Sequence, residues 1–311
     1  RVHPLVYVQA GRRFADLPRR TAAAMPSARP LLDSSAVVVV VGGTRGVAAE
    51  LSRALATRFK PRLFILGRQT PGQLAPDLRA GSDDEFLGRR REFIAQAQKT
   101  DPQRPLRDIL AEFQQLFQAR EAERHFDALR AIVGPSRVRH LRCDVTRLDD
   151  VRAAMTEIHS EVGHIDLLVN AAGVDESQTI VQKSLASFRR VRDVKLRGYQ
   201  HLKQVLQTKP PRHWWNIGSL TGVFGNHGQT DYAAANAYLA AAARHGPNTS
   251  EITLAYSLWA DTGMMTQPGR RELASALEQR FTPMSCAEGV RHFLRELDAG
   301  SAALLAVLAA V

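Results

Sequence analysis

The fold is decided by the stretch AVVVVVGGTRGVA, residues 36–48 of the 311-residue chain. Its first six residues form an apolar, mostly β-branched run, which is typical of a strand buried on both faces of a parallel sheet. The glycines that follow allow a tight turn and let the backbone approach a pyrophosphate at the N-terminus of the next helix. The same glycines alone would also suit a plain turn, but strand, glycine-rich loop and helix in this order predict a nucleotide site.

Beyond this stretch, strand-like and helix-like patterns alternate to the end of the chain. Strands are expected at residues 62–66, 138–141, 165–170, 213–217, 252–258 and 303–308, and helices at 47–59, 149–162, 185–206, 232–244 and 287–298. This alternation predicts an α/β fold with a Rossmann-type doubly wound parallel sheet and right-handed crossovers. We expect residues 36–311 to form the nucleotide-binding domain. Residues 1–35, with a strand at 4–9 and an Arg/Ala/Pro-rich stretch at 12–30, are expected to be a lead segment or linker.

The connection between the second and third expected strands is unusually long. It spans about 70 residues, where a Rossmann crossover normally needs only one helix. Apolar residues recur there at helical spacing, among them Leu106, Ile109, Leu110 and Phe113. A helical insertion is therefore expected at about 71–135, with a loop at 71–82, a charged helix at 83–98 and another helix or pair of helices at 105–132. We expect this insertion to be a platform for contacts rather than a part of the catalytic site.

The composition restricts the class of protein. The net charge of +11 comes mainly from arginine, since only six of the 42 basic residues are Lys. This excess suits an acidic protein partner or a phosphate-bearing substrate, or it has no specific meaning. No basic run is interleaved with aromatic residues, and no apolar run reaches about 18 residues, so we expect neither nucleic-acid binding nor a membrane span.

Cysteine usage indicates the compartment. Cys143 and Cys286 stand alone, and the ten His show no metal-ligand spacing, so we expect no disulfide, no metal site and a cytoplasmic location. The chain begins at Arg1 rather than Met, which suits either a domain excised from something longer or a start removed by processing.

The end of the second expected strand indicates which dinucleotide binds. A site for NAD usually has Asp or Glu there, for the ribose 2′-hydroxyl. This strand instead ends in Leu66-Gly67-Arg68, and the glycine-rich loop carries Arg45. Two guanidinium groups favour the 2′-phosphate of NADPH. The predicted cofactor contacts come from the loops after four strands and are Gly42, Gly43, Thr44, Arg45, Gly46, Val47, Arg68, Asp144, Val145, Asn170, Ala171, Ala172 and Gly173.

The fifth expected strand leads into Ser219, and Tyr232 follows thirteen residues later. With this spacing the sequence resembles the short-chain dehydrogenase/reductase superfamily, in which a Lys follows the Tyr by four residues and an Asn stands upstream. Here Asn236 follows by four and Lys195 stands upstream. That exchange resembles the ketoreductase domains of polyketide and fatty acid synthases, over about residues 36–311.

Further motifs narrow the resemblance. The run FGNHGQTDY, residues 224–232, the GGxRGV loop and the long insert are similar to ketoreductases of polyunsaturated fatty acid synthases and related iterative polyketide synthases. The Leu-Asp-Asp element that marks one stereochemical class of ketoreductase is Asp175-Glu176-Ser177 here, and the Trp that marks the other class is Phe224. The resemblance therefore does not carry a product stereochemistry to this chain.

The resemblance implies a division of labour that carbonyl chemistry explains. Hydride addition leaves an alkoxide, to which Tyr232 gives a proton although a free phenol has a pKa near 10. The charge of Lys195 would favour the tyrosinate, and Ser219 would donate to the developing oxyanion. Asn236, one helical turn beyond Tyr232, would hold Lys195 or a proton-relay water. Residues 259–265, WADTGMM, are expected to close over the nicotinamide and substrate as a lid.

Three functions fit these residues. The first is NADPH-dependent reduction of a β-ketoacyl thioester carried on an acyl carrier protein, beside other domains or subunits of a synthase. The second is a free-standing reductase of a small diffusible ketone. The third is a catalytically silent domain that binds NADPH or its neighbours, against which the intact set of Lys195, Ser219, Tyr232 and Asn236 argues.

Overall fold

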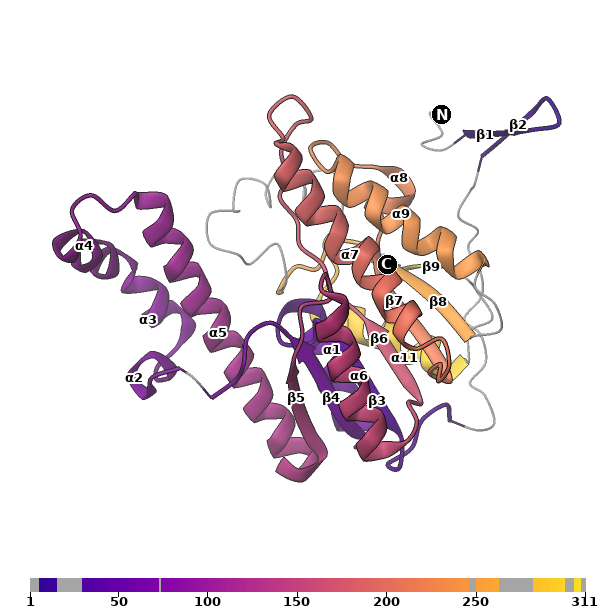
Figure 1. The fold of residues 1–311 in the computed structure, drawn as a ribbon, viewed down its shortest axis with the longest axis horizontal. Coiled ribbons are helices and arrows are strands. Elements are labelled where there is room, and N and C mark those ends of the chain that lie inside the picture. Colours follow the sequence, from indigo (N-terminus) through magenta and orange to yellow (C-terminus); the bar gives the residue numbers. More distant parts are fainter. Residues whose placement is uncertain are drawn as a thin grey trace.

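Seven parallel strands form the central sheet of the computed structural model, which describes residues 6–15, 30–72, 74–245, 250–262, 282–299 and 305–308. The strands are β3 (Val37–Val41), β4 (Arg62–Gly67), β5 (Val138–Arg142), β6 (Leu167–Asn170), β7 (His213–Ser219), β8 (Ser250–Tyr256) and β9 (Leu305–Leu308). They lie in the order β5-β4-β3-β6-β7-β8-β9 (Figure 1). Counted from β3, the first six follow the Rossmann order 3-2-1-4-5-6, which confirms the predicted fold class.

Helices cover both faces of this sheet (Figure 1). The helices outside the long insert are α1 (Gly46–Phe59), α6 (Leu148–Val162), α7 (Leu185–Val205), the single turn α8 (Thr221–Phe224), α9 (Thr230–His245) and α11 (Cys286–Ala299). The predicted strands of the sheet and the predicted helices outside the insert are confirmed to within two residues at each end, and α8 was not predicted. No helix in the described part of the chain is long and apolar enough to cross a bilayer.

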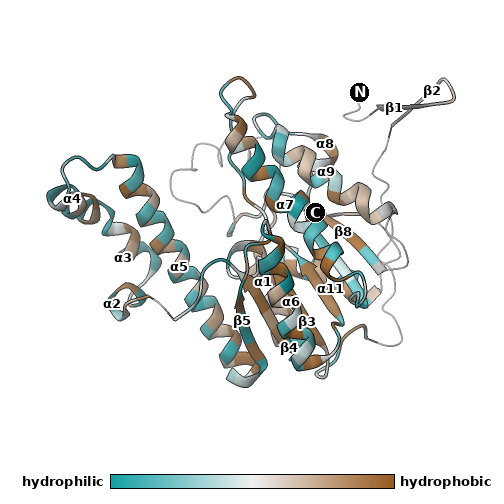
Figure 2. Ribbon diagram, in the orientation of Figure 1, coloured by the Kyte–Doolittle hydropathy of each residue, from teal (hydrophilic) through white to brown (hydrophobic). Residues whose placement is uncertain are grey.

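The valine run of β3 divides the core between the two faces. Val38 and Val40 pack with α1 and α11 through Leu51, Leu55 and Phe293, among others. The alternate valines, at 37, 39 and 41, pack with α6, α7 and α9 on the other face. Both faces are therefore covered, which is why the strand is apolar at every position (Figure 2).

The long connection between β4 and β5 is helical, as predicted. It contains α2 (Pro76–Arg79), α3 (Asp83–Gly88), α4 (Arg90–Thr100), α5 (Leu106–Val133) and the 3₁₀ turn η1 (Pro135–Arg137). Two details of the prediction are wrong. Residues 76–79 form a turn of helix within the expected loop, and the single charged helix expected at 83–98 is two helices, because α3 ends at Gly88.

Helix α5 belongs to two parts of the molecule. Its first half packs against α3 and α4 through Phe113 and Phe117, away from the sheet (Figure 1). Its second half is buried against the sheet through Phe126, Leu129 and Val133. This second half takes the place of the single helix that a Rossmann crossover needs.

The N-terminal residues form a hairpin of their own. Strand β1 (Val6–Gln9) pairs antiparallel with β2 (Arg12–Ala15), and this two-stranded sheet is separate from the central one. Ala10 and Gly11, between them, both have positive φ angles, of 49° and 75°, as a two-residue hairpin turn requires. The strand predicted at 4–9 is confirmed for Val6–Gln9, and residues 4 and 5 lie outside the described residues. The linker predicted from residue 12 is wrong for Arg12–Ala15.

Candidate active site

A cleft of about 550 Å³ lies where the carboxyl ends of β3, β4, β5 and β6 meet. After β3 the chain enters α1 on one face of the sheet, and after β6 it leads to α7 on the other. Ligands of open α/β sheets bind at such a topological switch point, and the volume is in the range of small-molecule sites. The cleft is therefore the candidate cofactor site.

The glycine-rich loop is shaped for close backbone approach. Gly42 has φ +80°, and a Cβ atom there would lie 2.8 Å from the Cα of Ala172, so conformation and space both exclude a side chain. Helix α1 begins at Gly46, with neither a side-chain cap from Arg45 nor an acidic residue in its first turn. Its N–H groups and the positive end of its dipole thus face the cleft unneutralised, which fits a pyrophosphate.

Two arginines line the cleft, and each has a carboxylate within electrostatic range, Glu121 for Arg45 and Asp144 for Arg68. Arg45 and Arg68 both line it, as does Glu121 of α5. Burial lowers the pKa of Arg45. The negative charge of Glu121 opposes this lowering, and the positive charge of Arg68 adds to it. Burial raises the pKa of Glu121, and the charge of Arg45 opposes this. The two guanidinium groups fit a 2′-phosphate, although the insertion brings a carboxylate to the same place.

Most predicted cofactor residues converge on the cleft. Those that line it are Gly42, Thr44, Arg45, Gly46, Val47, Arg68, Asp144, Val145, Ala171, Ala172 and Gly173. Gly43 and Asn170 do not. Gly43 is packed against Val40, and the side chain of Asn170 is buried, where it donates to Asn216 Oδ1 at 3.1 Å.

Helix α5 also contributes to the cleft, which the sequence did not indicate. Phe117, Gln118 and Glu121 line it. The expectation that the segment 71–135 takes no part in catalysis stays a prediction. Arg190, Asp193 and Arg197 of α7 were missed as well. The helical spacing of α5 showed that it had a buried face, but only the tertiary structure shows what that face meets.

Lys195 links the cleft to Tyr232. Its side chain is buried, and its Nζ donates to the carbonyl of Ile217, a residue of the cleft wall, at 2.8 Å. A Cβ atom at Gly173 would lie 3.1 Å from Lys195 Cε, so that glycine leaves room for the lysine. The Nζ lies 5.9 Å from the centre of the Tyr232 ring. Burial lowers the pKa of Lys195 to about 8.

Besides Lys195, the predicted catalytic residues are Ser219 on β7 and Tyr232 and Asn236 on α9. Ser219 ends β7, where its Oγ accepts from the Thr221 N–H and donates to Thr221 Oγ1, both at 3.2 Å. Tyr232 is buried in the first turn of α9. Asn236 donates to the Tyr232 carbonyl at 2.8 Å, and its Oδ1 is buried without a partner among the described residues. Asn236 thus bonds to the backbone of Tyr232, whereas Lys195 bonds to Ile217.

The predicted lid is only partly described. Trp259 is buried and forms a β-bridge with Met284. Gly263, Met264 and Met265 lie outside the described residues, so closure over a substrate stays a prediction.

The sequence is similar to that of a known domain family and of large multidomain synthases. Residues 36–261 match the KR domain family. Over 274 residues, 87% of this chain, the sequence is 27% identical to the polyketide synthase GfsA of Streptomyces halstedii. Over 241 residues, 74% of the chain, it is 28% identical to a polyunsaturated fatty acid synthase polypeptide of a Thraustochytrium species. The chain spans only 3% and 8% of the length of these two relatives.

Solved structures agree on the fold. The ketoreductase PlmKR1, from the first module of phoslactomycin biosynthesis in Streptomyces sp. HK803, superposes with a TM-score of 0.69 at 22% identity, over 98% of this chain and 59% of that one. The first ketoreductase of the tylosin polyketide synthase gives 0.68 at 23% identity, over 98% and 55%. With the family match over residues 36–261, the chain belongs to the KR domains, ketoreductase domains of the short-chain dehydrogenase/reductase superfamily as found in modular polyketide synthases and polyunsaturated fatty acid synthases.

Proposed function

We propose that this domain reduces a β-ketoacyl thioester, carried on an acyl carrier protein, to the β-hydroxyacyl thioester, with NADPH as the reductant. The observation that carries the proposal is the position of Lys195, whose Nζ touches the cleft wall at Ile217 and lies 5.9 Å from the Tyr232 ring. A cation buried between the cleft and a phenol suits carbonyl reduction, because it favours the phenolate that forms when the phenol gives up its proton.

The chain's own residues divide the work between binding and proton transfer. The turn at Gly42, the N-terminus of α1, Arg45 and Arg68 would hold NADPH, which supplies the hydride when bound. Tyr232 would give its proton to the carbonyl oxygen, and the Lys195 cation would stabilise the resulting phenolate. Ser219 would donate to the same oxygen, an interaction typically worth about 10²–10³ in rate.

Partners and location follow from the family rather than from the site. The relatives are multidomain synthases, so we propose an acyl carrier protein and neighbouring synthase domains as partners. The arginine excess, net charge +11, suits an acidic carrier. A cytoplasmic location stays a prediction.

The test is NADPH consumption by the purified chain with a β-ketoacyl pantetheine thioester, followed by chiral analysis of the product. A free ketone of similar size is the comparison substrate. Turnover of the thioester at a higher kcat/KM than the ketone supports the proposal. Tight NADPH binding without turnover of either would support a silent domain, and a preference for the free ketone would favour a reductase of diffusible substrates.

A further inference from the structure

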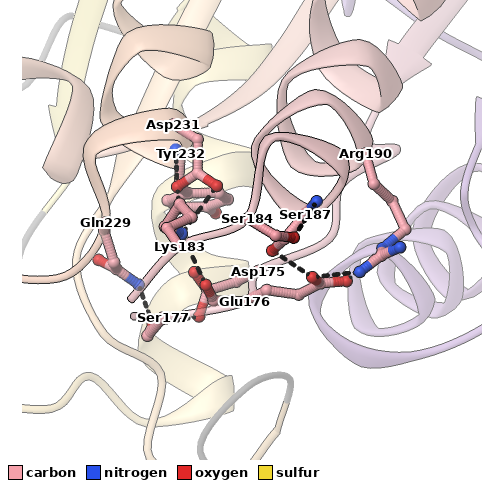
Figure 3. A network of polar contacts seen from close by, with 10 residues as sticks. All are labelled: Asp175, Glu176, Ser177, Lys183, Ser184, Ser187, Arg190, Gln229, Asp231 and Tyr232. Atoms are coloured by element: carbon pink, nitrogen blue, oxygen red, sulfur yellow. Dashed lines mark hydrogen bonds and ion pairs between the residues drawn. The ribbon is translucent and has the colours of Figure 1, made fainter. Parts of the chain in front are cut away.

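A buried ion pair joins the segment before α7 to the residue before Tyr232. The Nζ of Lys183 lies 2.8 Å from both carboxylate oxygens of Asp231 and donates to the carbonyl of Glu176 at 2.7 Å (Figure 3). The two side chains are 1% and 0% exposed. Pairs of this kind are rare, because both charges must leave water.

The carboxylate of this pair also holds the backbone of Tyr232. Asp231 Oδ1 accepts from the Tyr232 N–H at 2.9 Å, in the first turn of α9. One carboxylate therefore bonds to a lysine from another segment and to the residue that carries the proposed acid. Besides this pair, Lys195 of α7 places its charge near the ring of Tyr232.

Two further hydrogen bonds join the same two segments. The Gln178 N–H donates to the carbonyl of Gly228 at 2.9 Å, and Gln229 Nε2 donates to Ser177 Oγ at 3.2 Å. Glu176 is held in turn by Ser187 and Arg190 of α7 (Figure 3). Residues 175–184 and 226–231 thus form one bonded unit beside Tyr232.

We propose that Lys183 is a positioning residue for the reduction: it neutralises Asp231, so that this side chain can hold the Tyr232 N–H at the start of α9 without its charge opposing the Tyr232 phenolate. The proposal rests on the proposed function, in which Tyr232 is the acid. An unpaired buried carboxylate bonded to the backbone of Tyr232 would disfavour a second negative charge on the side chain of that residue. With Lys183 in place, Asp231 can accept from Tyr232 without that penalty.

Three variants separate the effect of the Asp231 charge from the effect of its hydrogen bond to the Tyr232 N–H. K183M leaves the carboxylate unpaired, K183M/D231N removes both charges but keeps an acceptor for the Tyr232 N–H, and K183M/D231A removes the acceptor as well. We expect K183M to lower kcat by about tenfold or more with little change in the Kd of NADPH, and K183M/D231N to recover to within about threefold of the parent. K183M/D231A should have about tenfold lower kcat than K183M/D231N. If K183M does not fold, the two charge-neutral variants decide by this ratio alone.

K203M is the matched control. Lys203 pairs at 2.5 Å with Glu251, another buried carboxylate, but at the opposite, amino end of β8. The K203M variant should have a lower melting temperature than the parent and a kcat close to that of the parent. Equal kcat in K183M/D231N and K183M/D231A, or a loss of Tm in K183M with parental kcat, would overturn the proposal.

A measurement without substrate keeps the proposal separate from the proposed function. The tyrosinate absorbance of Tyr232, taken as the difference between each protein and the same protein carrying Y232F, is followed as the pH is raised. Tyr232 should ionise at higher pH in K183M than in K183M/D231N, whether or not a β-ketoacyl thioester is turned over. If Tyr232 titrates identically in K183M and K183M/D231N, the proposed role of the Lys183–Asp231 pair is wrong. If these titrations differ as expected but the parent reduces no thioester, only the proposed function is wrong.

Discussion

Lys195 and Tyr232 come from different helices, yet the lysine Nζ lies 5.9 Å from the centre of the tyrosine ring. The lysine sits on α7 and the tyrosine on α9, and the Ile217 carbonyl, at 2.8 Å, fixes the Nζ between them. We expect this geometry to make the two groups act as one unit in the reduction.

We therefore expect Tyr232→Phe to lower kcat by at least about 100-fold, because it removes the proton donor itself. Lys195→Ala should lower kcat less, and the double variant should lie close to Tyr232→Phe, since groups that act as one unit are not additive. Kinetics on one β-ketoacyl thioester measure all three. NADPH binding, through the glycine-rich loop, should survive in each. Turnover near that of the parent in Tyr232→Phe would rule out the proposed mechanism.

The activity should depend on pH through Lys195. Burial lowers its pKa to about 8, so the free protein loses this cation as the pH rises through that value. The cation favours the phenolate, and we expect kcat/KM to fall above about pH 8 and to be level below it, down to the range where carboxylates titrate. Lys195→Ala should lack this alkaline limb at pH 8. A parent profile that stays flat to pH 10 would contradict the assignment of Lys195.

Cofactor preference should depend on Arg68. Arg68→Asp puts a carboxylate where we place the 2′-phosphate, so the Kd for NADPH should rise about tenfold or more while that for NADH changes by less than about threefold. Fluorescence titration with both cofactors measures this. Arg142→Asp, the same change at the exposed end of the neighbouring β5 and outside the cleft, is the control. Equal affinity of the parent for both cofactors would sink the NADPH assignment.

Glu121 should oppose the 2′-phosphate. Its carboxylate lines the cleft within range of the charge of Arg45, so a phosphate bound there meets a like charge. Glu121→Gln should tighten NADPH binding about threefold to tenfold and leave NADH binding little changed. Glu112→Gln, on the same helix but outside the cleft, where the carboxylate pairs with Arg104, should change neither. Weaker NADPH binding in Glu121→Gln would instead mean that the carboxylate holds Arg45 in place.

Arg120 should be the main polar support of the inserted helices. Its fully buried guanidinium donates to the carbonyls of Leu78, Ala80 and Gly81 and to Asp83. Arg120→Met removes this donor from all four acceptors, of which only Gly81 and Asp83 keep Arg124, and should lower the free energy of unfolding by about 3 kcal/mol.

Arg124 provides the comparison for this prediction, because it bonds to Gly81 and Asp83 from an exposed position. Arg124→Met should lower the free energy of unfolding by no more than about 1 kcal/mol. Chemical denaturation measures both variants. Equal losses would mean that burial of the guanidinium has no special weight.

Local patterns were enough to predict most of the architecture. A strand covered on both faces must be apolar throughout, so the run at 37–41 identified the centre of the sheet, and the glycines after it identified its carboxyl edge. Chain order then placed the loops of four strands at that edge, which is why eleven of the thirteen predicted cofactor residues line one cleft. The hairpin at 6–15 was half missed, because four residues of mixed character carry little pattern.

The sequence by itself predicted the doubly wound parallel sheet and the position of the cleft at its carboxyl edge, because both depend on short-range periodicity and chain order. The resemblance to ketoreductases supplied the set of Lys195, Ser219, Tyr232 and Asn236, whose roles stay a prediction. Only the tertiary structure decided that Glu121 of a distant helix faces Arg45, that Asn170 turns away from the cleft to Asn216, and that Lys183 pairs with Asp231 across 48 residues. Those contacts depend on how long helices and loops pack against each other in the folded structure. A charged side chain looks the same in a sequence whether it ends in water or in a buried ion pair.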